Sequence, residues 1–179
     1  MAINYEYKLI FRVLIATIFS IFINLFYIIF FPLTYYPIYY FFKILNYNVI
    51  LQTVSSSLIF SNVIVTFIEA CIAASAYYLL LLLIVATKDI SFKDSVKMFL
   101  LGSLLILILN IVRIIILIFI LLYSGTDFFN AIHIFFWQFI STIYVAGVWI
   151  FLVWKFKVKN IPIYSDLKYL YERSLLKKK

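Results

Sequence analysis

The sequence predicts an all-α integral membrane protein with about four transmembrane helices and both termini in the cytoplasm. Composition is the first observation behind this fold class. Hydrophobic residues occupy 67% of the 179 positions and charged residues only 12%, and the mean hydropathy is +1.15. Soluble domains carry about 25% charged residues, so this composition is typical of a chain that lies in lipid.

Four segments are long and apolar enough to cross a bilayer, because about 20 apolar residues at about 1.5 Å each span a hydrocarbon core of about 30 Å. They are Val13–Phe31, Phe67–Ala86, Met98–Leu122 and Phe129–Trp154. The first is too long for the apolar part of a signal peptide and is expected to remain as an anchor. Residues 1–155 are therefore predicted to form one polytopic membrane domain, and residues 156–179 a basic cytoplasmic tail.

The basic residues lie beside these segments and set the predicted orientation. They cluster before the first segment, between the second and third, and after the fourth, at Lys8, Arg12, Lys88, Lys93, Lys97, Lys155, Lys157, Lys159 and Lys177 to Lys179. Cytoplasmic loops carry an excess of Lys and Arg, so these three regions are predicted to be cytoplasmic. The net charge of +8 thus indicates a membrane surface and not a nucleic-acid partner.

Two features are expected on the outer side, between the first and second spans. The aromatic stretch Tyr35–Phe42 is suited to the outer headgroup region. Within Asn46–Thr66, alternating side chains flank a polar turn at Ser55–Ser57, which is typical of a β-hairpin. An open hairpin cannot face hydrocarbon, so it is expected at the outer surface. The alternative is a longer second helix that starts near Leu58.

Residue counts disfavour several kinds of site. Three scattered glycines are too few for a phosphate-binding loop. One histidine and seven carboxylates argue against a transition-metal site. The single cysteine, Cys71, excludes an internal disulfide and leaves one free thiol. We therefore expect no cofactor and no metal.

Arg113 is the most informative residue for function. It lies within an uncharged run, Met98–Tyr123, that is otherwise interrupted only by Asn110. A guanidinium at bilayer depth costs roughly 2.5–3.5 kcal/mol on insertion scales, so an intramembrane charge indicates a functional role by default. Its long side chain could reach several ångströms toward the outer interface.

The only cysteine and the only histidine are predicted in the same layer as this arginine. Cys71 and His133 each lie about one turn, roughly 6 Å, below the predicted outer end of their segments. Three helices would then direct a thiol, an imidazole and a guanidinium toward one outward-facing layer. Asn110 precedes Arg113 by about one turn, where its amide could hold the guanidinium or a substrate carbonyl.

Each of these residues also has an ordinary explanation. A lone cysteine such as Cys71 is more often a small buried hydrophobe. A histidine near a membrane interface, as predicted for His133, is often just a polar contact with lipid headgroups. Only the combination of the three side chains indicates chemistry.

Three short segments resemble the Cys, Asn-x-x-Arg and His blocks of the archaeosortase/exosortase family. They are Phe67-Ile68-Glu69-Ala70-Cys71-Ile72-Ala73-Ala74, Asn110-Ile111-Val112-Arg113-Ile114 and Ala131-Ile132-His133-Ile134-Phe135-Phe136-Trp137. Their order and the membrane segments between them match as well, over roughly Tyr47 to Lys155. One position departs from the pattern, because the family commonly has glycine two residues after the cysteine and this chain has Ala73.

The resemblance implies a membrane-embedded cysteine protease or transpeptidase in the cell membrane, with its active site facing the extracytoplasmic side. The implied substrates are exported proteins that end in a short sorting motif, a transmembrane helix and a basic tail. Cleavage occurs outside that helix, and the new C-terminus passes to an acceptor that is expected to be a lipid. Cys71 would be the nucleophile, His133 the general acid and base, and Arg113 the donor to the oxyanion or substrate carbonyl.

Two other classes of function stay open. Arg113 could bind an anionic small molecule in a membrane transport subunit, in which case Arg113 is essential and Cys71 is dispensable. Arg113 could instead pair with a carboxylate of another protein in a non-catalytic membrane assembly. In that case both Cys71 and His133 tolerate substitution.

Overall fold

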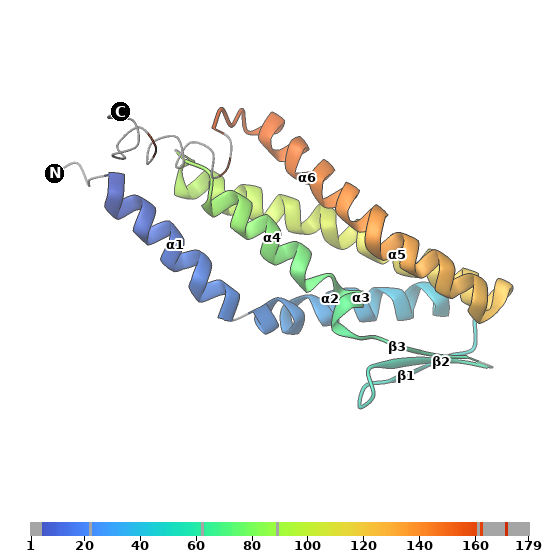
Figure 1. Cartoon of the computed structure of the whole chain (residues 1–179). Coiled ribbons are helices and arrows are strands. Elements are labelled where there is room, and N and C mark those ends of the chain that lie inside the picture. The colour runs from blue at the N-terminus through green and yellow to red at the C-terminus, as the bar shows by residue number, and fades with distance from the viewer. Residues whose placement is uncertain are drawn as a thin grey trace.

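The computed structural model describes residues 5–21, 23–61, 63–88, 90–160, 162 and 171. The described chain is mostly helical, and a small sheet lies at one end of the helices (Figure 1). A helical protein with one β segment ahead of the cysteine was predicted, and this outline is confirmed. The predicted basic tail, residues 156–179, falls largely outside the described residues.

The elements are α1 (Tyr5–Ile21), α2 (Ile23–Ile44), β1 (Val49–Gln52), β2 (Ser57–Phe60), β3 (Val63–Thr66), α3 (Glu69–Ile72), α4 (Ala74–Val85), α5 (Phe92–Phe135), the π-helix η1 (Phe136–Ile140) and α6 (Ser141–Lys155). Gly125 interrupts α5 with a φ of 80° and a ψ of −179°. The chain reverses near this point, so the remainder of α5, η1 and α6 run back along the first part of α5 (Figure 1).

The helices differ from the predicted spans at three places. Val13–Phe31 extends across the boundary between α1 and α2, and Phe67–Ala86 is divided into α3 and α4 at Ala73. Met98–Leu122 and Phe129–Trp154 are joined by helix on both sides of Gly125. Hydropathy reports where apolar residues accumulate, and it does not detect single residues that leave helical backbone angles. In the described part of the chain, two helices, α2 and α5, are long and apolar enough to cross a membrane.

The aromatic stretch Tyr35–Phe42 is part of α2. Tyr35, Ile38 and Phe42 are at most 1% exposed, and their spacing places them on one helical face. The Phe42 ring lies 5.1 Å from the ring of Phe60 on β2. The stretch therefore contributes a buried face that packs on the sheet, which its aromatic composition alone did not reveal.

The predicted β-hairpin is confirmed and has a third strand. β1 and β2 pair antiparallel with Val49 opposite Phe60, and β2 and β3 pair antiparallel with Leu58 opposite Val65. The alternative of a helix from Leu58 is wrong, because this residue lies in the central strand. Side chains of β1 and β3 alternate between half-buried and exposed, so one face of the sheet covers the helices.

Close contact among three helices holds the bundle together. A Cβ atom added at Gly102 of α5 would come within 2.7 Å of a Leu80 methyl on α4 and 2.8 Å of a Leu152 methyl on α6. The missing side chain thus lets both helices approach α5. Ser91 is the N-cap of α5, and its Oγ accepts a hydrogen bond from the Asp94 amide at 3.1 Å.

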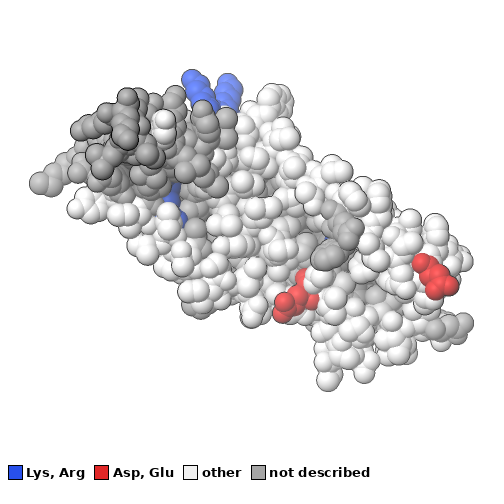
Figure 2. Space-filling view, viewed as in Figure 1, with Lys and Arg blue, Asp and Glu red and all other residues white. Residues whose placement is uncertain are grey.

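The two ends of the molecule differ in charge. On the face drawn in Figure 2, Lys and Arg side chains lie at one end and Asp and Glu side chains toward the other. The start of α1, the α4–α5 connection and the end of α6 meet at the basic end (Figure 1), where Asn160 Nδ2 donates to the Lys88 carbonyl at 3.2 Å. The sheet, α3 and the reversal at Gly125 lie toward the opposite end.

Tyr35 fixes the sheet to α2, because its hydroxyl donates to the carbonyl oxygens of Gln52 at 3.1 Å and Ser57 at 2.7 Å. We expect Tyr35→Phe to lower the free energy of unfolding by about 1–2 kcal/mol. Backbone amides of β1 and β2 would exchange faster in hydrogen-exchange mass spectrometry while those of α5 keep their protection. Tyr36→Phe, at an exposed neighbour, is the control. Equal exchange in the two variants would contradict this role.

Candidate active site

The site is built around a break in the helix that follows the sheet. Ala73 adopts the left-handed conformation, with φ 58° and ψ 35°, and separates the single turn of α3 from α4. A residue with a Cβ atom pays a steric cost of roughly 1–2 kcal/mol there. In a continuous helix the amide of Ser75 would bond to the carbonyl of Cys71. The break leaves this carbonyl open to side chains from another helix.

Two side chains of α5 meet at the Cys71 carbonyl oxygen. Asn110 Nδ2 donates to it at 2.8 Å, and Arg113 Nη2 lies 3.4 Å from it. Asn110 is fully buried, and Arg113 is only 6% exposed. The Asn110 amide thus holds the backbone carbonyl of the cysteine, and its role in positioning a substrate stays a prediction.

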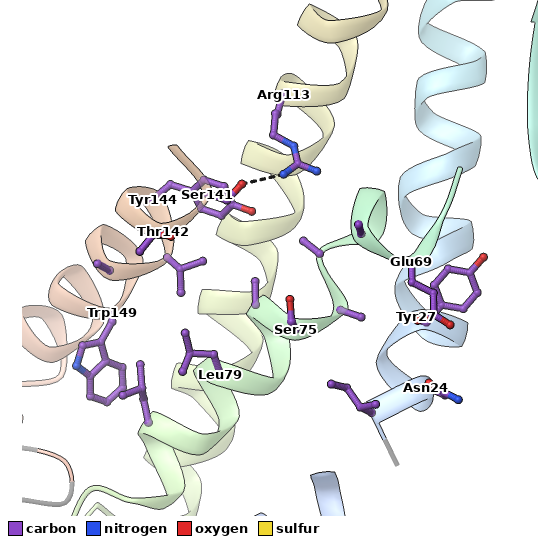
Figure 3. Close-up of a pocket in the computed structure, with 18 of the residues that line it drawn as sticks. Asn24, Tyr27, Glu69, Ser75, Leu79, Arg113, Ser141, Thr142, Tyr144 and Trp149 are labelled. Atoms are coloured by element: carbon purple, nitrogen blue, oxygen red, sulfur yellow. Dashed lines mark hydrogen bonds between the residues drawn. The ribbon is translucent and has the colours of Figure 1, made fainter. Parts of the chain in front are cut away.

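Arg113 is also held from α6. Its Nη1 donates to Ser141 Oγ at 2.8 Å, as Figure 3 shows. The Ser141 hydroxyl in turn donates to the Phe136 carbonyl at 2.9 Å. Phe136 begins the π-helix η1, a kind of turn that often occurs at functional sites. The wider turn therefore gives the hydroxyl its acceptor and fixes it toward the guanidinium.

The guanidinium is paired only with neutral oxygen atoms in the part of the chain that the structure describes. No carboxylate lies within ion-pair distance of Arg113 there, and its Nε is buried without a hydrogen-bond partner. Asn110 Oδ1 and the hydroxyls of Tyr77 and Tyr144 are likewise buried without a hydrogen-bond partner among the described residues. A buried charge is costly unless it is compensated. The Arg113 guanidinium is therefore suited to bind an anion or to donate hydrogen bonds to a developing oxyanion.

A cavity of about 810 Å³ opens beside this arginine, between α2, α4 and α6. Figure 3 shows Arg113 above it, with Ser141 and Tyr144 on one side and Ser75 on the other. Small side chains form the α3–α4 wall, at Ala70, Ala73, Ala74, Ser75 and Ala76. Arg113 is the one basic residue among the described lining. The volume is typical of ligand pockets, which run from about 300 to 1,000 Å³.

The Cys71 thiol is free and half-buried. It is not among the groups that line the cavity, although its neighbours Ala70 and Ala73 are. Cys71 also packs against the hydrophobic core, as expected of a small apolar side chain. Of the predicted layer of Cys71, His133 and Arg113, the structure brings Arg113 to the Cys71 backbone, and Asn110 joins it there.

Among the described residues, no hydrogen bond joins His133 to the cysteine. Its ring lies 5.3 Å from that of Phe129, it is half-buried, and it lies within electrostatic reach of Arg113. Arg113 bonds instead to Ser141, which follows His133 by roughly 12 Å along the helical path.

Ser141 is the residue that sequence reasoning missed. It stands with Thr142 as a pair of hydroxyls inside an apolar segment, and that pair was the available signal. Tyr144, one turn further, also lines the cavity. Aromatic side chains are the more conspicuous feature of the segment that follows His133, and they obscure these two hydroxyls.

Comparison with known proteins yields no relative: no protein-family model, curated protein or solved structure matches this chain. The function proposed for the site therefore rests on its own residues and on the resemblance of the three short sequence segments.

Ala73→Gly tests the helix break directly. Glycine adopts the left-handed conformation without steric cost, so we expect this variant to be more stable than the parent by up to about 1 kcal/mol. Ala146→Gly, at an exposed position within α6, is the matched control and should be destabilising by about 0.5–1 kcal/mol. Thermal unfolding in one detergent measures both. Destabilisation of similar size at both positions would argue that Ala73 is helical.

Proposed function

We propose that this protein is a membrane-embedded cysteine protease or transpeptidase. Its substrates are exported proteins with a C-terminal sorting motif, a transmembrane helix and a basic tail, and it transfers the new C-terminus to an acceptor, a lipid. One observation carries the proposal. The backbone carbonyl of Cys71, the only cysteine of the chain, is held by a buried amide and a buried guanidinium beside a cavity, and no carboxylate of the described residues lies within ion-pair distance of that guanidinium.

Exposed apolar stripes support residence in a membrane. On α5, side chains four residues apart are between 41% and 64% exposed, at Leu100, Leu104, Ile108, Val112 and Ile116. Monomeric soluble proteins rarely expose such continuous apolar surface. We assign four crossings, formed by α1 with the start of α2, by α3 with α4, by α5 up to Gly125, and by the remainder of α5 with α6.

The proposed orientation follows from the two ends of the molecule. The basic end belongs in the cytoplasm, and an open sheet edge cannot lie in hydrocarbon, so the sheet lies outside. From Phe92 to Gly125, α5 is about 50 Å long, which exceeds a hydrocarbon core of about 30 Å. The sheet and the second half of α2 thus have room beyond the core, and the cavity begins near the outer boundary.

The proposed chemistry uses Cys71, His133 and Arg113 in turn. His133 takes the thiol proton, and the thiolate attacks the scissile carbonyl to form a tetrahedral intermediate whose oxyanion accepts hydrogen bonds from Arg113. The carbon–nitrogen bond then breaks, His133 returns the proton to the leaving amine, and a thioester remains. An acceptor nucleophile loses its proton to His133 and displaces Cys71.

This sequence requires His133 to approach the thiol when substrate binds. Catalytic hydrogen bonds are often long or absent without substrate and tighten in the complex. The His133 imidazole has no hydrogen-bond partner in the described part of the chain, so no side-chain hydrogen bond opposes such a movement.

A second candidate is binding of an anionic small molecule, as in a transport subunit. The uncompensated guanidinium of Arg113 on a cavity wall favours it. This alternative needs Arg113 and does not need the thiol, so substitution of Cys71 separates the two candidates.

Cys71→Ala and Cys71→Ser test the protease directly. Each is co-expressed with a panel of reporters, which are exported proteins from the same cell that end in a helix and a basic tail. Processing is measured from the size and the membrane retention of each reporter. We expect processing of at least one reporter to fall at least about 1,000-fold in both variants because the nucleophile is lost. Normal membrane levels of each variant are the control. Unchanged processing would remove the protease and leave anion binding.

Arg113→Gln separates function from stability. Removal of an uncompensated buried charge should leave the variant at least as stable as the parent, while processing falls about 100- to 1,000-fold because one oxyanion donor is lost. Asn110→Ala is the comparison, and it should lower the free energy of unfolding by about 1–3 kcal/mol because the Cys71 carbonyl loses its closest donor. Loss of stability in Arg113→Gln with normal processing per folded molecule would assign the arginine a structural role.

A further inference from the structure

No strand among the described residues pairs with the outer edge of β3, and this strand leads to the cysteine. We propose that the exported substrate binds as an extended strand along the outer edge of β3, immediately before its scissile bond. This inference rests on the proposed function and names how that site would recognise its substrate. The ligand class is an extended peptide segment without proline, bound mainly through its backbone.

The two edges of the sheet differ. The strand order is β1-β2-β3, so β1 and β3 are both edge strands, and β1 packs against α2. Among the described residues, no strand pairs with the outer edge of β3. Its sequence, Val63-Ile64-Val65-Thr66, contains none of the charges or prolines with which proteins usually protect an exposed edge.

The register shows which backbone groups face outward. The Phe67 amide donates to the Ser56 carbonyl at 2.9 Å, so these two residues form a hydrogen-bonded pair of the β2–β3 ladder. Such pairs alternate along an antiparallel ladder. Val65 and Val63 are therefore bonded to β2, whereas the N–H and C=O groups of Ile64 and Thr66 turn away from the sheet. They offer two donors and two acceptors to an added strand.

Most of the path from this edge to the site is exposed. Phe67, which follows β3, is buried, whereas Ile68, Glu69 and Ala70, which lead on to Cys71, are exposed. Glu69 and Ala70 also line the cavity beside Arg113. Thr66 and Cys71 are five positions apart. At about 3.3 Å per residue, they are therefore separated by at most about 17 Å, a distance that five residues of an extended peptide can span. A strand on β3 would thus deliver its following residues to the cavity.

The exposed face of the sheet adds a preference for side chains. Ile50, Ile59 and Ile64 stand opposite one another across the three strands, and Ile50 and Ile64 are each 65% exposed. An added strand would extend this row with every second side chain. Apolar residues at alternate positions are therefore expected in the bound segment.

Cysteine cross-linking in the inactive Cys71→Ala protein tests binding apart from catalysis. The protein with Ile64→Cys is combined with the reporter that the active protein processes. Each version of this reporter carries one cysteine at a different position of the segment before its helix. We expect disulfides at reporter positions two residues apart. Ile59→Cys is the control, because β2 lies about 9.6 Å from the position of an added strand and disulfides need Cα atoms within about 7 Å.

The outcomes are distinguishable from failure of the proposed function. No cross-link from Ile64, with normal processing by the unsubstituted protein, would overturn strand addition and leave the protease intact. Cross-links with a period of two, with processing that does not depend on Cys71, would keep strand binding and reject the protease. A disulfide between two copies of Ile64→Cys in place of the reporter would overturn the proposal in favour of self-association.

Ile64→Pro and Ile64→Thr form a matched pair in the active protein. Both shorten an exposed side chain, but only proline removes the outward N–H donor. We expect processing to fall about tenfold or more with proline and to stay within about twofold of the parent with threonine. Equal losses in the two variants, with unchanged thermal unfolding, would overturn backbone recognition.

Discussion

Burial of the Arg113 guanidinium is the constraint on which the rest of the structure depends. The Arg113 side chain is only 6% exposed, so its charge needs polar neighbours. Helices provide few of them, because their backbone groups are already paired. The chain supplies them by leaving regular helix at two places. The left-handed Ala73 opens the Cys71 carbonyl, and the π-helix before α6 gives Ser141 an acceptor that directs it to the guanidinium.

The same irregularities connect the sheet to the site. β3 continues through Phe67 and Ile68 into α3, so the sheet, the cysteine and the break at Ala73 form one continuous stretch of chain (Figure 1). Tyr35 anchors this stretch to α2, and Asn110 anchors it to α5. The position of the thiol is therefore set from both sides by buried hydrogen bonds, while the cavity next to Arg113 stays open between α2, α4 and α6.

Much of this arrangement could be predicted from the sequence, and the remainder could not for identifiable reasons. Alternation around Ser55–Ser57 predicted the hairpin, and an isolated charge in an apolar run predicted the importance of Arg113. The break at Ala73 could not be predicted because alanine is the strongest helix former. Depth counted along four separate spans put His133 level with the site, whereas the structure bonds Arg113 to Ser141, further along that path. Tertiary contacts decided these points, and local patterns do not contain them.

The most direct measurement is detection of an acyl-enzyme on Cys71. The protein is purified after co-expression with its processed reporter, quenched in acid and analysed by intact and peptide mass spectrometry with and without hydroxylamine. A thioester intermediate predicts that the peptide containing Cys71 carries the mass of the reporter's N-terminal fragment and that hydroxylamine releases it. Continued processing with an unmodified Cys71, or with a stable adduct on a different residue, would contradict the account.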